Sequence, residues 1–471
     1  MKVLYIGGGY VGACSAAVAV DSGHDTLVYD IDANRMSMLG SNDYQQIESC
    51  LFENGLAEML VRNRERIKFV SDYKKVIKFL DKIELVFLCL PTPEKVGHDG
   101  ESDLSYYLSA VKDIGKSLAG RQNGKQGNYV VVVNKSTVPV NMVDITEEIL
   151  KKCGVKNFGV VSNPEFLVEG KAMAGSVQPY RVVIGAGNEK DFAVMRAFYQ
   201  RFYDSSLVKY LEVNPKEAAG AKLLANYLIF ARLATTFDVV GRLCELFPDI
   251  KFENVRSVLT SDPRIGDWGF YDSFYAGGSC LTKDAASLAY QLEEAGAQAN
   301  LVKQVSASNH YQRDHFLDRA STELKWNWKN KVVAILGVAF KKSTNDVRNS
   351  GALDIMTRLI DWGVKELRIY DPAATPMLKR VFDQTKDGRY EKITYFGSES
   401  EALIGSHAGL ILTDWPQFKT LVDTIKDTCQ MRPYLLMDGR RMLARQFDDL
   451  KNFGFDIIAV GSPLIRGNNN K

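Results

Sequence analysis

Residues 1–30 read MKVLYIGGGYVGACSAAVAVDSGHDTLVYD, and this stretch decides the fold. Its first apolar run ends in Gly7, Gly9 and Gly12, which form G-x-G-x-x-G immediately before a helical pattern. In such a turn the first glycine allows the tight bend, the second lets the backbone approach a pyrophosphate, and the third lets helix and strand pack closely. A second apolar run then carries Asp30 near its end. The stretch therefore predicts a dinucleotide-binding βαβ unit.

The acidic residue after this loop indicates which dinucleotide is bound. Asp30 follows Gly12 by 18 residues, where a carboxylate can accept hydrogen bonds from the ribose hydroxyls. A carboxylate at this place repels a 2′-phosphate, so the pattern favours NAD over NADP. Arg35 weakens this preference, because an arginine nearby is the usual means of accepting that phosphate.

Further apolar runs separated by helical patterns extend this organisation along the chain. Strands that are apolar on both sides and alternate with helices predict a parallel sheet covered on both faces. The first block has runs at 3–7, 26–31, 85–90, 129–134 and 160–164, and the second has runs at 331–337, 366–372, 408–414, 434–439 and 455–461. A long helical run lies between the blocks and begins with Asn214, Pro215 and Glu217, a typical helix start.

The predicted fold class is therefore α/β: two Rossmann-like doubly wound domains joined by a long central helix and a helical middle domain. We expect an N-terminal NAD-binding domain over residues 1–210, a central helical domain over 211–328 that carries Cys280, and a C-terminal α/β domain over 329–465. The polar, Asn-rich residues 466–471 are expected to form a disordered tail.

Composition narrows the choice of partners and compartment. The chain has 471 residues, 46% hydrophobic and 25% charged, and its net charge of +2 provides no overall field for nucleic acid or an anionic membrane. Seven scattered cysteines without a C-x-x-C pair indicate reduced thiols, and the five histidines have no metal-ligand spacing. No signal peptide or bilayer-spanning segment is expected. The sequence predicts a cytoplasmic protein without metal, nucleic acid or membrane partners.

One cysteine differs from the other six in its surroundings. Cys280 lies in YAGGSCLTKD (275–284), behind two glycines and four residues before Asp284. Small neighbours keep the sulfur approachable, and a lysine or a helix N-terminus nearby can lower the pKa of a thiol enough to give thiolate. For the other six cysteines, a role as small buried hydrophobic residues is the better hypothesis.

Other polar residues stand where a purely structural sequence would not need them. Lys222 and Asn226 lie four residues apart on the long helix and so share a face. Two segments follow apolar runs directly: Ser136, Thr137 and Pro139 lie in KSTVP, and Glu165 and Glu169 lie in SNPEFLVEG. Each of these residues alone is compatible with capping or a solvated surface. Together they indicate a ligand at the carboxyl edge of a doubly wound sheet.

In these segments the chain resembles the UDP-glucose/GDP-mannose dehydrogenase family over nearly its whole length. The matching segments are GGGYVG, VYDIDANR, ENGLAEML, KSTVPV, NPEFLVEG, the helix of Lys222 and Asn226, DPRIG, GGSCLTKD, LGVAFKKSTNDVR, YDP and DGRR. The resemblance implies an NAD-dependent, four-electron oxidation of a UDP-hexose, UDP-glucose first, to UDP-glucuronate. It further implies a thiohemiacetal and a thioester on the cysteine, and reduction of two NAD per sugar.

The resemblance also implies roles for individual residues. Cys280 would be the nucleophile, with Lys222, Asn226 and Asp284 around the reacting carbon, Glu165 as the base for thioester hydrolysis, and Thr137 holding the catalytic water or cofactor. The cofactor-binding residues would be Gly7, Gly9, Tyr10, Val11, Gly12, Asp30, Arg35, Thr92, Thr137, Glu169, Lys283 and Arg348. The substrate-binding residues would be Glu165, Phe166, Leu167, Lys222, Asn226, Arg264, Tyr275, Gly277, Cys280, Phe340, Lys341 and Arg440. In this family Arg264 would reach the substrate of a neighbouring subunit, which requires a homo-oligomer, at least a dimer.

Two positions depart from the family pattern and keep other functions open. Ala276 stands where the family usually has an aromatic residue, and Tyr275 stands where it usually has glycine. Loss of a ring beside the hexose could make room for another sugar, so a dehydrogenase for a UDP-N-acetylhexosamine or GDP-mannose is an alternative. A non-catalytic NAD-binding protein of the same fold is a second alternative, although Cys280 and its polar partners are present.

Overall fold

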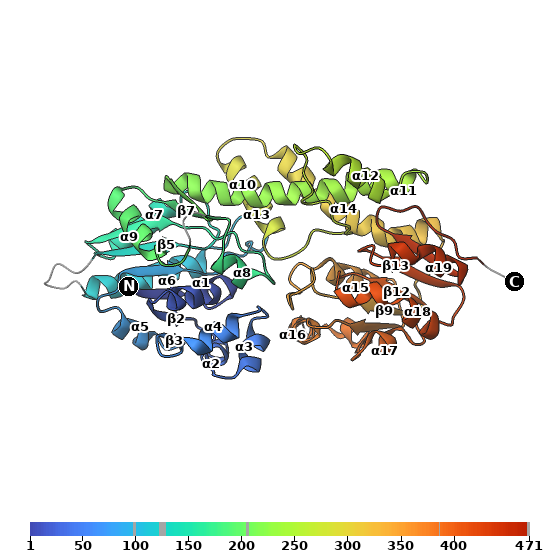
Figure 1. The fold of residues 1–471 in the computed structure, drawn as a ribbon, viewed down its shortest axis with the longest axis horizontal. Coiled ribbons are helices and arrows are strands. Elements are labelled where there is room, and N and C mark those ends of the chain that lie inside the picture. Colours follow the sequence, from blue (N-terminus) through green and yellow to red (C-terminus); the bar gives the residue numbers. More distant parts are fainter. Residues whose placement is uncertain (98–99, 122–128, 204–206, 386, 469–471) are drawn as a thin grey trace. The chain divides into compact units, whose positions relative to one another are not determined.

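A computed structural model describes residues 1–97, 100–121, 129–203, 207–385 and 387–468 (Figure 1). The chain divides into two compact units. Unit 1 comprises Met1–Ala225 and Tyr290–Gly296, and unit 2 comprises Asn226–Ala289 and Ala297–Lys471. Each unit contains one β-sheet, so the predicted pair of α/β domains is confirmed.

The sheet of unit 1 has the strand order β3-β2-β1-β4-β5-β6-β7-β8. Its strands are β1 (Lys2–Ile6), β2 (Asp25–Tyr29), β3 (Ile67–Val70), β4 (Leu85–Leu88), β5 (Val130–Asn134), β6 (Phe158–Ser162), β7 (Arg181–Gly185) and β8 (Lys209–Val213). Strands β1 to β6 run parallel, whereas β6 and β7 meet in an antiparallel pairing of Ser162 with Gly185. The loops that follow the parallel strands therefore gather at one edge, where doubly wound sheets bind ligands.

Apolar residues on successive strand positions enter two separate cores, one on each face of this sheet. In β1, Val3 and Tyr5 belong to one core, and Leu4 and Ile6 belong to the other. The helices of unit 1 are α1 (Tyr10–Asp21), α2 (Ala33–Leu39), α3 (Tyr44–Cys50), α4 (Leu56–Arg62), α5 (Tyr73–Phe79), α6 (Ser105–Arg121), α7 (Met142–Lys152), α8 (Ala172–Val177) and α9 (Glu189–Tyr199). Burial on both faces explains the continuous apolar runs in the sequence.

The long central helix begins where the sequence predicts. Helix α10 (Pro215–Ala234) continues through π-helical turns (Thr235–Val240) into α11 (Gly241–Leu246). At its start the Asn214 side chain accepts a hydrogen bond from the Glu217 N–H, and the Glu217 carboxylate accepts one from the Asn214 N–H. This reciprocal pair is a capping box. The remaining central helices are α12 (Phe252–Thr260), α13 (Leu281–Glu294) and α14 (Asn300–Glu323).

The run Pro215–Leu246 is also long and apolar enough to cross a membrane by length and composition, with a mean hydropathy of 1.4. The expectation of no such segment is therefore wrong on these two criteria. Core helices of soluble proteins meet them too, and 39% of the apolar window is buried within the protein. The cytoplasmic location stays a prediction.

Unit 2 contains an all-parallel sheet with the order β11-β10-β9-β12-β13-β14. Its strands are β9 (Val332–Leu336), β10 (Glu366–Tyr370), β11 (Ile393–Tyr395), β12 (Ala408–Ile411), β13 (Tyr434–Asp438) and β14 (Phe455–Ala459). Its helices after α14 are α15 (Gly351–Asp361), α16 (Thr375–Thr385), α17 (Glu399–Leu403), α18 (Val422–Thr428) and α19 (Phe447–Asn452). One core unites this sheet with Phe316, Leu317 and Ala320 of α14.

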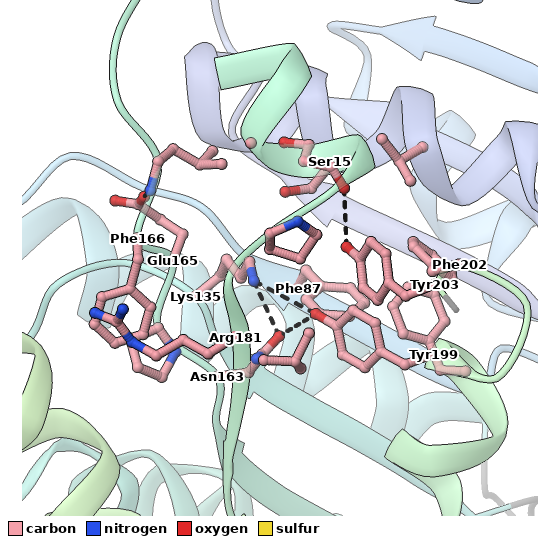
Figure 2. A pocket seen from close by; sticks show the side chains of 18 of the residues that line it. Ser15, Phe87, Lys135, Asn163, Glu165, Phe166, Arg181, Tyr199, Phe202 and Tyr203 are labelled. Atoms are coloured by element: carbon pink, nitrogen blue, oxygen red, sulfur yellow. Dashed lines mark hydrogen bonds between the residues drawn. The ribbon is translucent and has the colours of Figure 1, made fainter. Parts of the chain in front are cut away.

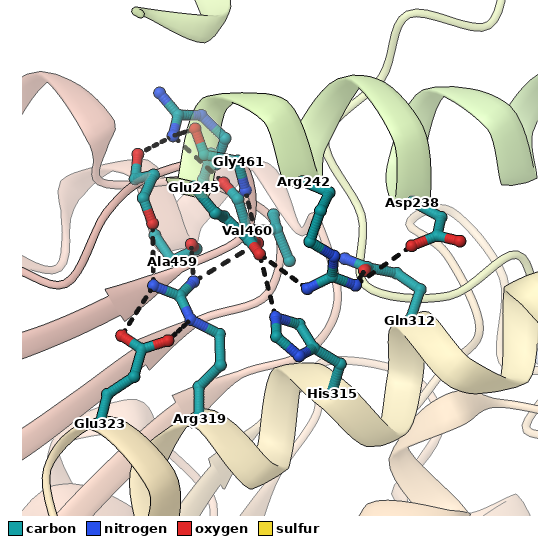
Figure 3. Close-up of polar contacts among 12 residues, drawn as sticks. Asp238, Arg242, Glu245, Gln312, His315, Arg319, Glu323, Ala459, Val460 and Gly461 are labelled. Atoms are coloured by element: carbon teal, nitrogen blue, oxygen red, sulfur yellow. Dashed lines mark hydrogen bonds and ion pairs between the residues drawn. The ribbon is translucent and has the colours of Figure 1, made fainter. Parts of the chain in front are cut away.

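A buried ionic network further joins the central helices to this sheet (Figure 3). The nearly buried Glu245 carboxylate of α11 lies 3.0 Å from Arg242, 3.1 Å from His315 and 3.4 Å from Arg319 of α14. It also accepts a hydrogen bond from the Gly461 N–H, just after β14. A buried carboxylate with this many partners is satisfied, so the network holds the helices against the sheet edge.

The structure differs from the sequence prediction at several points. The ten predicted strands are present with bounds that differ by one to three residues, and β3, β7, β8 and β11 are additional. Strands β8 and β11 contain no buried residue and so leave no continuous apolar run. Part of the predicted central domain, Asn226–Ala289, lies in the same compact unit as the C-terminal sheet. The three-domain division stays a prediction.

The predicted disordered tail is corrected in its first half. Arg466 donates to the Glu323 carbonyl, Gly467 donates to the Asp456 carboxylate, and the Asn468 N–H donates to the Lys451 carbonyl. These bonds fix residues 466–468 against unit 2. Residues 469–471 lie outside the described residues.

Candidate active site

The glycine loop of unit 1 has the geometry that a dinucleotide requires. Gly7 adopts φ +104°, and a Cβ there would lie 2.1 Å from the Cys89 carbonyl oxygen. A Cβ on Gly12 would lie 1.9 Å from the Gly7 carbonyl oxygen, whereas a Cβ on Gly9 would meet nothing within 4 Å. The open side at Gly9 precedes α1, whose first residues Tyr10 and Val11 present the helix N-terminus. The residues present therefore fit NAD, and Gly9 and the start of α1 would hold its pyrophosphate.

Asp30 fastens this loop to the end of β2. Its carboxylate accepts hydrogen bonds from the Gly8 N–H at 2.7 Å and the Asp32 N–H at 2.9 Å. Arg35 lies 3.0 Å from the same carboxylate and 3.5 Å from that of Asp32. Two carboxylates thus already engage the guanidinium that a 2′-phosphate would need, which agrees with a preference for NAD.

Two predicted cofactor residues meet after neighbouring strands of this sheet. The Thr92 hydroxyl, in the loop after β4, donates to the Thr137 carbonyl, just past β5, at 2.8 Å. The adjacent Ser136 hydroxyl donates to the Leu90 carbonyl at 2.7 Å. Glu169 lies farther along the chain and is half-buried. The KSTVP segment is thereby held at the carboxyl edge of the sheet.

Glu165 and Lys222 form a pair within unit 1. The Lys222 ammonium of α10 lies 3.5 Å from a Glu165 oxygen and 5.2 Å from the Phe166 ring centroid. The other Glu165 oxygen accepts a hydrogen bond from the Leu167 N–H. The Arg181 guanidinium lies 3.9 Å from the same Phe166 ring. The contacts hold the Glu165–Leu167 segment in place and leave a carboxylate beside a buried cation.

A cavity of about 50 Å³ is lined by Glu165, Lys135 and Tyr199, among other residues (Figure 2). The Lys135 ammonium donates to the Asn163 amide oxygen at 3.1 Å, and the Tyr199 hydroxyl donates to the same oxygen at 2.6 Å. Burial lowers the pKa of Lys135 to about 8. No sequence motif predicts a role for Lys135, Asn163 or Tyr199, although Lys135 and Asn163 lie in or beside KSTVP and SNPEFLVEG. The sequence signal that could have identified Lys135 and Asn163 is their position directly after the apolar strands β5 and β6.

Cys280 belongs to unit 2 and lies directly before the first residue of α13. It is exposed, and its carbonyl accepts the Asp284 N–H at 2.8 Å. A thiol at a helix N-terminus is near the positive end of the helix dipole, which favours thiolate. Cys14 and Cys89 are buried instead, and burial raises the pKa of Cys89 to about 12. Among these three cysteines, Cys280 is the one placed for nucleophilic chemistry.

Polar partners surround the first turn of the same helix. The Asn226 amide donates to one Asp284 oxygen at 2.5 Å, and the Lys283 ammonium lies 2.5 Å from the other. Asp284 is buried with 1% of its surface exposed. Asn226 thus turns its polar side chain toward the helix that begins after Cys280. The structure brings together Asn226, Lys283 and Asp284, three of the predicted site residues.

The loop before Cys280 is seated on the C-terminal sheet of unit 2. The Phe274 N–H donates to the Gly439 carbonyl at 3.1 Å, just past β13. A Cβ on Gly278, which has φ +96°, would lie 2.8 Å from the Phe340 ring. Ala276 is buried, and the Asn309 side chain donates to its carbonyl and accepts from its N–H. The position at which the family usually has an aromatic ring is therefore occupied by the buried methyl group of Ala276.

Unit 2 also carries the predicted substrate-binding cations Arg264, Lys341 and Arg440 and the predicted cofactor-binding Arg348. Arg440 donates to the carbonyls of Leu412 and Phe340 at 2.9 and 2.7 Å. Lys341 lies over the ring of Phe340, and Arg348 forms a bidentate pair with Asp346. Arg264 is 88% exposed at its side chain and forms a bidentate pair with Asp262.

The predicted site residues thus form two groups, one in each unit. Unit 1 holds the glycine loop, Asp30, Thr92, Thr137, Glu165 and Lys222, and unit 2 holds Asn226, Cys280, Lys283, Asp284, Phe340, Lys341, Arg348 and Arg440. No group of three or more His, Cys, Asp or Glu side chains that could hold a metal ion occurs in the part of the chain that the structure describes. A Rossmann-like dinucleotide site is typical of an NAD-dependent dehydrogenase, and unit 2 carries, in addition, the exposed thiol of Cys280.

The chain belongs to the UDP-glucose/GDP-mannose dehydrogenase family, a family of NAD-dependent nucleotide-sugar dehydrogenases. The family's NAD-binding domain matches residues 1–203, its central domain residues 216–311, and its UDP-binding domain residues 334–445. These matches establish NAD as the cofactor and a nucleotide sugar as the kind of substrate.

Individual relatives match along nearly the whole chain. UDP-glucose 6-dehydrogenase TuaD of Bacillus subtilis is 30% identical over 471 residues, which cover 99% of this chain and 94% of the relative. UDP-glucose 6-dehydrogenase 1 of Glycine max is 32% identical over 496 residues, with 98% of both chains covered. The solved structure of a UDP-glucose dehydrogenase from Pyrobaculum islandicum matches with a TM-score of 0.82 at 26% identity, covering 94% of this chain and 95% of that one.

Proposed function

We propose that this chain oxidises the C6 alcohol of UDP-glucose to the carboxylate of UDP-glucuronate through a thioester on Cys280. Support comes from the UDP-glucose 6-dehydrogenases among its relatives and from the chemistry of the residues that it carries. The observation on which the proposal depends is the exposed Cys280 at the N-terminus of α13, four residues before Asp284.

The first oxidation converts the C6 alcohol to an aldehyde. NAD, when bound, supplies the hydride acceptor in each of two oxidations, one molecule per oxidation. A water held by Asp284 and assisted by Lys222 takes the hydroxyl proton. The Lys222 ammonium and the Asn226 amide donate to the C6 oxygen as negative charge develops on it.

Covalent capture by the thiol follows. The Cys280 thiolate attacks the aldehyde carbon, so that a carbon–sulfur bond forms and the carbonyl oxygen takes up a proton as a thiohemiacetal. Loss of the second hydride and of the hydroxyl proton leaves a thioester. Because the intermediate stays bonded to the protein, no free aldehyde needs to leave between the two oxidations.

Hydrolysis of the thioester releases the acid. Glu165 takes a proton from water, the hydroxide oxygen bonds to the thioester carbon, and the carbon–sulfur bond breaks to regenerate the Cys280 thiolate. The Lys222 ammonium lies 3.5 Å from a Glu165 oxygen and orients the carboxylate that acts as the base. Thr137 would help to hold the attacking water.

Cys280→Ala tests the covalent route. We expect acid formation to fall by at least about a thousandfold, because removal of a nucleophile in a covalent mechanism typically has effects of this size. NAD and UDP-glucose binding should persist in calorimetry, since the glycine loop and the predicted substrate-binding cations Lys341 and Arg440 are unchanged. Cys429→Ala, which removes a buried thiol of the same unit, is the matched control. Unchanged turnover by Cys280→Ala would refute the proposal and would favour a route without a thioester.

A different nucleotide sugar is the second candidate, and Ala276 is the observation that favours it. Ala276 has a small, buried side chain at a position where the family usually has an aromatic residue. The fold also accommodates an N-acetylated sugar: the solved structure of a UDP-D-ManNAc dehydrogenase from Pyrococcus horikoshii matches with a TM-score of 0.78 at 22% identity. NADH formation with UDP-glucose, UDP-N-acetylmannosamine, UDP-N-acetylglucosamine and GDP-mannose would separate the candidates. If UDP-glucose has a lower kcat/KM than any of the others, the first candidate is wrong.

We further propose a homo-oligomer, at least a dimer. Arg264 carries an exposed guanidinium suited to a substrate phosphate, and Leu228, Val239, Leu246 and Phe247 leave an apolar stripe exposed on and just past the central helices. Burial of such a stripe is typical of a subunit interface. Sedimentation velocity should give at least twice the monomer mass, 52.6 kDa. A monomer that retains full activity would contradict this proposal.

A further inference from the structure

Asn349 makes four hydrogen bonds with the loop that carries the thiol. Its side-chain N–H groups donate to the Gly278 carbonyl at 3.2 Å and to the Thr282 hydroxyl at 2.6 Å. Its amide oxygen accepts from the Tyr275 hydroxyl at 3.1 Å, and its backbone carbonyl accepts from the Gly278 N–H at 3.2 Å. One residue thus binds the loop on both sides of Cys280.

The local backbone is shaped for this contact. Asn349 adopts φ +51°, a left-handed conformation that asparagine tolerates better than most residues. A Cβ on Gly277 would lie 2.5 Å from the Asn349 carbonyl oxygen, and a Cβ on Gly351 would lie 3.0 Å from the Tyr275 Cβ. The glycines therefore allow the two segments to approach closely, and Asn349 supplies the polar bonds between them.

Asn349 also lies next to a residue that the family resemblance assigns to the cofactor. Asn349 follows Arg348, which the family resemblance assigns to the cofactor, in the loop between β9 and α15. The glycine-rich segment 277–280 has much conformational freedom to lose, so an exposed thiol there needs to be held if it is to attack one carbon. Four hydrogen bonds from one residue can restrict that freedom.

We propose that Asn349 is a positioning residue that fixes the Cys280 thiol for attack, with Tyr275 and Thr282 as its side-chain partners. This inference deepens the proposed function and rests on Cys280 being the nucleophile. This role would explain why Tyr275 departs from the family pattern. Its ring fills the space beside Gly351, and its hydroxyl orients the Asn349 amide. Asn349 touches no reacting atom in this scheme and acts only through the loop.

The test compares Asn349→Ala with Asn330→Ala. Asn330 is exposed in the same unit, has φ +61° and contacts no residue of the thiol loop, so its variant matches the backbone strain of the other without touching the loop. We expect Asn349→Ala to lower kcat about tenfold, with KM for NAD changed less than about twofold, as expected when an interaction in the transition state is lost. Asn330→Ala should leave both constants unchanged.

A second readout measures the thiol itself. The rate of Cys280 alkylation by iodoacetamide, followed peptide by peptide in mass spectra across pH 6–10, should change in midpoint or plateau for Asn349→Ala and Tyr275→Phe and not for Asn330→Ala. Asn349→Asp tolerates the same φ and keeps the acceptor for Tyr275, so it should recover part of kcat. A purely structural role would change the stability of the protein without changing the alkylation profile.

The outcomes separate the inference from the function on which it rests. If Asn349→Ala matches Asn330→Ala in kcat and in alkylation, the positioning role is wrong, even if Cys280→Ala is inactive. If Cys280→Ala retains turnover, the covalent function fails, whatever the alkylation profiles are. If Asn349→Ala proves too unstable to assay, Tyr275→Phe and Thr282→Val, which each remove one bond, provide the same comparison, and unchanged kcat and alkylation in both would overturn the proposal.

Discussion

The loop after the first strand of each sheet contains a glycine with positive φ and is bound by an aspartate that follows the neighbouring strand. In unit 1, Gly7 follows β1 with φ +104°, and Asp30 after β2 accepts hydrogen bonds from the loop. In unit 2, Gly337 follows β9 with φ +89°, and Asp371 after β10 accepts hydrogen bonds from the corresponding loop. The helix begins three residues after Gly7, but only at Gly351 in unit 2.

The two aspartates differ in their remaining capacity for a ligand. Asp371 accepts from the N–H groups of Val338, Ala339, Ala373 and Ala374 and from the Trp415 indole, and it is buried. Asp30 accepts from two backbone N–H groups and pairs with Arg35, a partly exposed side chain. Asp371 is thus saturated by internal donors, whereas we predict that Asp30 keeps acceptor capacity for the ribose of a dinucleotide.

The largest expected effect concerns Asp371. Asp371→Ala should lower the free energy of unfolding of unit 2 by about 3–5 kcal/mol, because it leaves buried donors unsatisfied. All five tryptophans, at positions 268, 326, 328, 362 and 415, lie in unit 2, so tryptophan fluorescence in urea reports on this unit. If Asp371→Ala unfolds at the same urea concentration as the unchanged protein, Asp371 does not have the structural role that distinguishes it from Asp30.

Asp30→Ala is the matching change in unit 1 and should act on the ligand. We expect KM for NAD to rise about tenfold, as is typical when a charged hydrogen-bond acceptor for the ribose is lost. The freed Arg35 should also improve the use of NADP relative to NAD. Initial rates with both cofactors measure this, and the tryptophan-monitored unfolding of unit 2 should be unchanged. A cofactor preference that stays the same would show that Asp30 is structural, as Asp371 is.

The smallest expected effect is a dependence of the stability of unit 2 on pH. Burial, with Arg242 and Arg319 nearby, lowers the pKa of His315 from 6.5 to about 4 (Figure 3). The unfolded chain therefore binds more protons than the folded one between these values, and the free energy of unfolding falls as pH drops from about 6.5 to about 4. Allowing for solvent screening, we expect a loss of about 2 kcal/mol.

His315→Gln should flatten this dependence in tryptophan-monitored urea unfolding between pH 4 and 7. His24→Gln is the control, since burial also lowers the pKa of His24 to about 4 but His24 lies in unit 1. If the free energy of unfolding of His315→Gln still falls with decreasing pH, other groups and not His315 cause the pH dependence.

The sequence by itself determined the features that depend on local patterns. The glycine loop with Asp30, the ten apolar strands and the capping box of Asn214 and Glu217 could be predicted, because each follows from backbone geometry, strand burial or helix capping within about thirty residues. The prominence of Cys280 also followed from its small and polar neighbours. Strands such as β8 and β11 escaped prediction, since edge strands with exposed residues lack an apolar run.

Only the tertiary structure decided which polar residues meet. Nothing near Asp371 in the sequence indicates that the Trp415 indole and the Val338 N–H would saturate its carboxylate, and nothing near Cys280 indicates that Asn349 would hold its loop. Such contacts join residues tens of positions apart, and they depend on how strands and loops converge at a sheet edge. Residue type and spacing along the chain do not encode this convergence, because hydrogen bonding between distant groups is set by the packing of the whole unit.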